Sequence, residues 1–206
     1  MANEWTVFVD GLTDFDLGNL SDDQRKKMMS MAINGTARKY RTQAAREVRS
    51  QVNLPARYVS ASSKGMYVSK FATPGDLEGQ ITARGRPTSL ARFAAGSPKV
   101  GKPGVVVEVA PGRARLMKRA FAIKLPQGSA SVETKYNLGL AIRLRPGESL
   151  RNKVSARRVS KGLYLLYGPS VDQVFRSVDG TGVANDLVPD IEKDLSAEFI
   201  RLIGVL

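Results

Sequence analysis

Basic side chains are the residues of this chain whose types and spacing are best suited to chemistry, and that chemistry is the binding of anions. Arg113, Arg115 and Lys118 follow Pro111, and a second set lies between Pro146 and Lys161 with Glu148 as its one acid: Arg151, Lys153, Arg157, Arg158 and Lys161. No aromatic residue lies within the second set, so it offers nucleobases no ring on which to stack. Contact with a nucleic acid would therefore go to phosphates, without regard to sequence. Two solvated loops are the competing interpretation.

Groups for covalent or acid–base catalysis are scarce. The 206 residues include no His and no Cys, which excludes a Ser-His-Asp triad and any thiol nucleophile. Carboxylate pairs such as Asp22 with Asp23 and Glu192 with Asp194 remain, but a helix start explains the first pair and a solvated helix face the second. The glycines form no phosphate-binding loop. The sequence predicts a protein that is not an enzyme and uses no metal or cofactor.

Charge is sorted along the chain. There are 32 Lys and Arg against 19 Asp and Glu, a net charge of +13, yet residues 1–20 and 179–206 each carry −4, which leaves +21 for residues 21–178. A basic middle attracts polyanions, and acidic ends can pair with it between neighbouring subunits. A soluble surface of uneven charge is the alternative.

Length and composition predict one soluble domain, residues 1–206, with 42% hydrophobic residues to form a core. No apolar run approaches the roughly 18 residues of a membrane helix, and the start of the chain lacks the pattern of a signal peptide. We expect a cytosolic site of synthesis and no membrane partner.

A strand is expected at residues 5–9, within an acidic arm of residues 1–20, and a long helix after it. Ser21 and Gln24 have the spacing of a capping box, and apolar residues then recur at steps of three or four until Pro55. A helix from Asp22 to Val52 would be about 46 Å long. Its other face carries bases that are either solvated or turned toward a partner: Arg25, Lys26, Arg38, Arg41, Arg46 and Arg49.

Residues 56–170 have the pattern of a β-rich region. Short apolar or alternating runs predict strands, separated by three long loops at residues 94–103, 111–119 and 146–161. The runs are residues 66–71, 80–84, 105–109, 120–125, 138–144 and 163–166. Residues 171–206 return to helix, with an apolar stripe from Leu187 to Leu202 and with Pro189 acceptable only in the first turn. The predicted fold is α+β, with both helices packed on an antiparallel sheet or sandwich.

Several of these segments, taken in order, resemble the minor tail protein Z family of long-tailed bacteriophages. The matching pieces are residues 32–37 with Arg41 and Thr42, residues 52–58, residues 86–93, Ala120 with Phe121, and residues 166–171 with 173–175. They span most of the chain. The resemblance implies a virion protein of the phage tail and neck, assembled in the host bacterial cytoplasm, that acts in tail completion at the head-proximal end of the tail.

The resemblance also implies partners and contact residues. We expect a ring, hexameric by that resemblance, which joins the tail tube to the head connector and meets the tail terminator, tube or connector proteins. The subunit or tail interface would include Tyr167, Gly168, Pro169, Ser170, Val171, Phe175, Arg86 and Pro87. The two basic sets would face the DNA channel and contact genomic DNA without reading its sequence.

Two rival functions stay open at this point. The basic middle fits a free nucleic-acid-binding protein, whose affinity for DNA or RNA falls steeply with salt. A nuclease would instead need carboxylates that bind Mg²⁺.

Overall fold

The computed structural model describes residues 4–6, 20–126, 135, 137–150, 155–176 and 182–204. These residues form two compact units, each built from separate stretches of the chain. The helical unit comprises residues 1–48, 57–85 and 171–206, and the basic unit comprises residues 49–56 and 86–170. The sequence predicts one domain; the structure divides the chain into two units.

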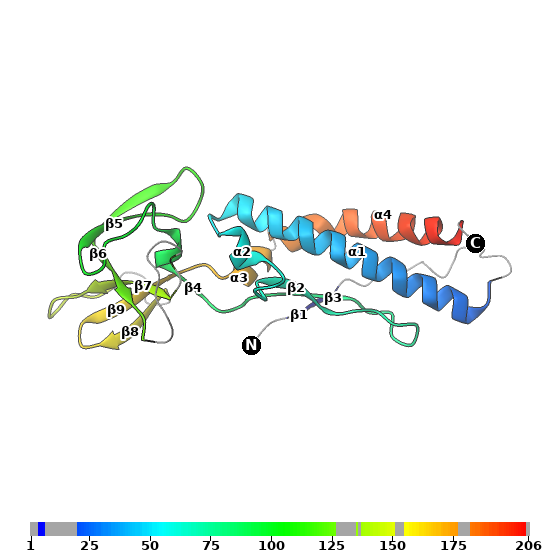
Figure 1. Cartoon of the computed structure of the whole chain (residues 1–206), viewed down its shortest axis with the longest axis horizontal. Helices are drawn as coiled ribbons and strands as arrows, with labels where there is room; N and C mark the ends of the chain where they lie inside the picture. Colours follow the sequence, from blue (N-terminus) through cyan, green and yellow to red (C-terminus); the bar gives the residue numbers. More distant parts are fainter. Residues whose placement is uncertain are drawn as a thin grey trace. The chain divides into compact units, whose positions relative to one another are not determined.

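The helical unit contains a three-stranded antiparallel sheet and four helices (Figure 1). The sheet has the order β1-β3-β2. Its elements are β1 (Glu4–Thr6), α1 (Asp22–Gln51, whose last residues enter the basic unit), α2 (Ala56–Val59), β2 (Met66–Lys70), β3 (Gln80–Ala83), α3 (Val171–Arg176) and α4 (Val183–Ile203).

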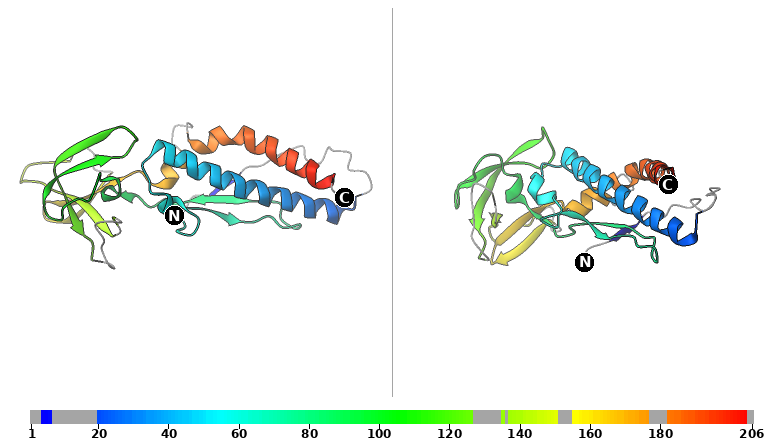
Figure 2. Two further views of the ribbon diagram at one scale, coloured as in Figure 1. Left: turned by 45° about the horizontal axis from the view of Figure 1, so that its top comes forward. Right: turned by 45° about the vertical axis from the view of Figure 1, so that its right-hand side comes forward.

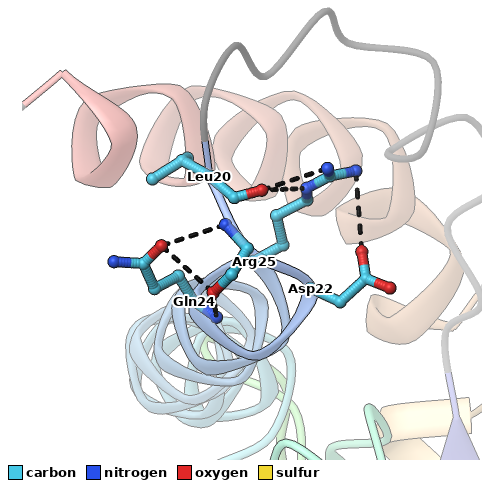
Figure 3. Close-up of polar contacts among 5 residues, drawn as sticks. Leu20, Asp22, Gln24 and Arg25 are labelled. Carbon is cyan, nitrogen blue, oxygen red and sulfur yellow. Dashed lines mark hydrogen bonds and ion pairs between the residues drawn. The ribbon is translucent and has the colours of Figure 1, made fainter.

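A capping box starts α1, as predicted. The Gln24 amide donates to the Ser21 hydroxyl at 3.3 Å, and the Ser21 amide donates to the Gln24 side-chain oxygen at 3.0 Å (Figure 3). Arg25 adds a contact at the same helix start, because its Nε and one Nη each donate to the carbonyl oxygen of Leu20 at 3.1 Å. Backbone groups that a helix start leaves without partners are thereby satisfied.

The long helices α1 and α4 lie side by side and run in opposite directions (Figures 1 and 2). Met28 and Ala32 of α1 form a buried cluster with Leu195 and Phe199 of α4. Further along, Lys39 Nζ and the Tyr40 hydroxyl each donate to Asp194 Oδ2 at 2.5 Å. The predicted stripe of α4 is confirmed, since Leu187, Ile191, Leu195 and Phe199 are buried.

The other side of α1 lies against the connection between β2 and β3. The Asn34 side chain exchanges two hydrogen bonds with the backbone of Ala72, at 2.8 and 2.9 Å. Gly79 permits a close approach, because a Cβ there would lie 2.8 Å from Ile33 Cγ2.

The sequence places Pro189 in a first turn, which is wrong: α4 begins at Val183, so Pro189 lies inside the helix. The buried Val183 and Ala184 extend the helix upstream of the predicted start.

The basic unit is built on a six-stranded antiparallel sheet. β4 (Thr88–Ser89), β7 and β8 all pair with β9, and the path continues from β7 through β6 to β5. The strands are β5 (Pro103–Glu108), β6 (Ala114–Lys124), β7 (Leu138–Arg143), β8 (Ala156–Ser160) and β9 (Leu163–Gly168), and a 3₁₀ helix, η1, spans Leu90–Phe93. The α+β class is therefore confirmed, with two antiparallel sheets in two units.

Candidate nucleic-acid interface

The two units differ sharply in charge. The basic unit carries eighteen Lys and Arg against three acids, a formal net charge of +15. The helical unit carries fourteen bases against sixteen acids, a net charge of −2. The imbalance seen along the sequence is thus concentrated in one folded body, which raises the local density of positive charge.

Arg115 and Lys118 lie on a strand, and Arg113 lies in the turn before it. The predicted loop at residues 111–119 is wrong, because β6 begins at Ala114 and pairs with β5 from Glu108 back toward Pro103. Gly112 makes the turn possible with φ of +72°, and its amide donates to Glu108 Oε1 at 2.7 Å. All three basic side chains are exposed.

Arg157, Arg158 and Lys161 belong to a second hairpin. The predicted loop at residues 146–161 ends in strand β8, which pairs with β9 through a turn at Lys161 and Gly162. The pairing sets Arg157 opposite Leu165 and Arg158 opposite Tyr164. All three basic side chains are exposed. Arg151 and Lys153, named with them, lie outside the described residues.

Strand directions bring the two hairpins to the same end of the sheet. β5 ends where β6 begins, β7 ends where β9 begins, and β8 ends there too. The β6 to β7 register runs only from Lys124 back to Ala120, whereas Ala114–Met117 pair with β5 alone, and the β5 register is irregular between Met117 and Phe121. At about 3.4 Å per residue, the part of β6 before Ala120 therefore extends, as a two-stranded ribbon with β5, about 20 Å past its last pair with β7. We call it the β5–β6 ribbon.

Arg119, at this end of the sheet, already forms an ion pair. Arg119 holds Glu148 with two bonds, at 3.0 and 2.7 Å, and Glu148 also accepts the Arg145 amide at 2.8 Å. These contacts, Arg119 first, lower the pKa of Glu148 to about 2. Among the described residues, the six bases of the two hairpins have no such ion pair. Their charge is therefore free to attract an anionic partner.

The residues named for a subunit or tail interface fall into two groups. Val171 and Phe175 are 0% and 1% exposed in the helical unit, so their side chains form its core and cannot form a subunit contact; this part of the prediction is corrected. The stripe at Val171, Val174 and Phe175 has the spacing of a core face as well as of an interface, which is why the sequence alone does not separate them.

The remaining interface residues lie in the basic unit. Tyr167 and Gly168 end β9 opposite Ser89 and Thr88. Ser170 is 0% exposed, so its side chain, like that of Val171, cannot form a subunit contact. A Cβ on Gly168 would lie 2.7 Å from the ring of Phe93, so this glycine is required for packing. Tyr167, Gly168 and Pro169 are half-buried, whereas Arg86 and Pro87 are exposed, as an interface needs.

Sequence reasoning missed two further bases and one acid at this sheet end. Arg143 ends β7 and Arg145 follows it, both exposed beside the start of β9. Glu148 was noted only as the acid of its loop, although it fixes that loop to β6. The alternation of basic residues at the end of a predicted strand was the signal by which these two arginines could have been found.

The carboxylate pairs have structural partners. Asp22 lies 3.8 Å from Arg25 in the first turn of α1, and Asp194 accepts bonds from α1. Within the described ranges no three His, Cys, Asp or Glu side chains are grouped to hold a metal ion. The described helices include none that is long and apolar enough to cross a membrane.

Comparison with known proteins returns no match: no protein family, no curated protein and no solved structure resembles this chain closely enough to count.

Proposed function

We propose that this chain is a structural virion protein of a long-tailed phage that completes the tail at its head-proximal end. In this role it forms a ring that joins the tail tube to the head connector around the DNA channel. The family resemblance of the sequence suggests the role, and the division of charge between the two folded units is the observation that supports it.

A closed ring needs two different surfaces of one subunit that fit each other. The two units have such surfaces in electrostatic terms. The helical unit exposes Asp186, Asp190 and Glu192 on α4. The basic unit exposes the Arg and Lys of its two hairpins, which form no ion pair with any residue that the structure describes. Opposite charges on two patches favour head-to-tail contacts between copies over symmetric pairing of like patches.

Charge reversal tests the ring. The double variant Asp186→Lys, Asp190→Lys is expected to be monomeric in light scattering, because it sets lysines of one subunit against the Arg and Lys of the next subunit. Reversal of Lys26 and Lys27 on α1 to Glu, which changes the net charge by the same amount in the opposite sense, is the control and should leave the oligomer intact. A wild-type chain that stays monomeric at all concentrations contradicts the ring.

The location is tested in particles. Reconstruction of an intact virion should place this chain as a ring between tail tube and connector, and particles without it should carry incomplete or unjoined tails. Density in the capsid shell, or infectious particles without the chain, contradicts the proposal.

A second candidate function, sequence-independent binding of nucleic acid, is favoured by the six exposed basic residues of the two hairpins at one end of the sheet. It predicts that the isolated chain shifts DNA or RNA in a gel at low salt and needs no other virion protein to do so.

A further inference from the structure

We propose that the β5–β6 ribbon and the β8–β9 hairpin together form one docking surface for the phosphates of duplex DNA. The surface consists of Arg113, Arg115, Lys118, Arg157, Arg158 and Lys161. Arg157 and Arg158 are neighbours on β8 and point to opposite faces, so the surface is the end and the β8 edge of the sheet and not one of its faces. The choice of duplex DNA among polyanions rests on the proposed function, in which DNA passes through the ring.

The geometry lets both hairpins bind one duplex. Both turns lie at the same end of the sheet, and the ribbon extends about 20 Å beyond β7. Duplex DNA carries one phosphate charge per 1.7 Å of axis, so about twelve charges fall within that length. The ribbon and the hairpin therefore reach different phosphates and do not compete for the same ones.

The side chains at this surface are better suited to contacts with phosphates than to contacts with nucleobases. The described aromatic residues of the basic unit are Phe93, which is buried, and Phe121, Tyr164 and Tyr167, which are half-buried. Unstacked bases of a single strand need exposed rings, and a duplex backbone does not. The exposed apolar residues nearby, Val106, Leu116 and Val159, are aliphatic, whereas membrane-surface segments rely on aromatic anchors as well as bases.

Arg119 is separated from this surface by its partner. Its guanidinium is engaged by both oxygens of Glu148, and one Nη also donates to the Arg143 carbonyl at 2.9 Å. Its charge is therefore neutralised locally, and it acts as a positioning residue that fixes the 145–148 turn beside the ribbon.

The test is the salt dependence of binding by the full-length chain to a labelled duplex of about 20 base pairs, followed by fluorescence anisotropy. Six phosphate contacts predict a log–log slope of about −5.4, which is a loss of about 10³-fold in affinity between roughly 50 and 200 mM salt. Replacing Arg113, Arg115 and Lys118 with Gln should reduce the slope to about −2.7 and the loss to about 40-fold. Replacing Arg157, Arg158 and Lys161 should do the same.

One control separates local contact from overall charge. Gln at Lys26, Lys27 and Arg46, which are exposed on α1, removes the same three charges from the helical unit and should leave the slope unchanged. An equal loss in the α1 control, a wild-type slope in either hairpin variant, or binding of phosphatidylserine vesicles in place of the duplex would overturn the inference.

The outcome is distinguishable from that of the proposed function. A chain that gives these slopes but lies outside the tail keeps the docking surface and removes the role in tail completion. A chain that forms the neck ring but shows no salt-dependent binding removes the docking surface alone.

Discussion

Removal of the Phe199 ring tests whether the contact between α1 and α4 holds the helical unit together. Phe199 is 0% exposed and lies in the cluster with Met28, Ala32 and Leu195. Burying a phenylalanine side chain contributes about 1.5–3 kcal/mol, and the cavity left by alanine adds to the loss. Phe199→Ala should therefore lower the free energy of unfolding of the helical unit by about 3–5 kcal/mol.

The neighbouring Ile200 supplies the control, because it is 50% exposed on the same helix. Ile200→Ala should cost less than about 1 kcal/mol. Since the chain has two units, the effect is best measured by hydrogen exchange of the α4 amides, which reports the local free energy of opening. Amides of the β6 to β7 ladder should be unchanged. Equal protection of α4 in the two variants would refute this account of the helical core.

Three further predictions concern single contacts. Gly65→Ala should destabilise the chain by about 3 kcal/mol in a denaturant titration, because a Cβ there overlaps the Tyr58 carbonyl and the backbone of Val59, whereas Gly75→Ala, with nothing within 4 Å, should have almost no effect. Tyr40→Phe should lower the free energy of unfolding by about 1–2 kcal/mol, because the hydrogen bond to the α4 carboxylate is lost; an unchanged free energy of unfolding would contradict this. Glu148 should titrate near pH 2 by NMR, and Arg119→Gln should raise that midpoint toward 4.5; an unmoved midpoint would contradict the assigned ion pair.

The sign of the pH effect follows from the lowered pKa of Glu148. A carboxyl whose pKa is lower in the folded state stabilises the fold at pH values above its unfolded pKa. That contribution is lost as the pH falls from about 4.5 toward about 2. Any loosening of the 145–148 turn should therefore appear only in this acidic window.

Local signals predicted much of the fold. The Ser21 and Gln24 spacing placed the start of α1, and Pro55 placed its end within a few residues. The apolar stripe of α4 was also predicted, because helix amphipathicity is encoded residue by residue. Most of the β-rich region followed from its apolar runs.

Other features depend on distant parts of the chain. Strand β8 and the first half of β6 were predicted as loops, since their residues are exposed and basic and lack the alternation of a half-buried strand. Their strand form comes from pairing with β9 and β5. The division into two units depends on contacts between distant stretches, because the chain passes between the units more than once and no linker marks the crossings.

The candidate site was predicted in composition but not in arrangement. The sequence named the six bases of the two hairpins, whereas only the antiparallel order shows that they share one sheet end. It also assigned Val171 and Phe175 to an interface although they form the core. An apolar spacing alone does not tell which surface it will meet.

The most direct test of the central claim is a reconstruction of the virion that contains this chain. The account predicts a ring at the head-proximal end of the tail, with the basic unit lining the channel beside the DNA. A position in the capsid, or a ring whose basic unit faces away from the DNA, would contradict it.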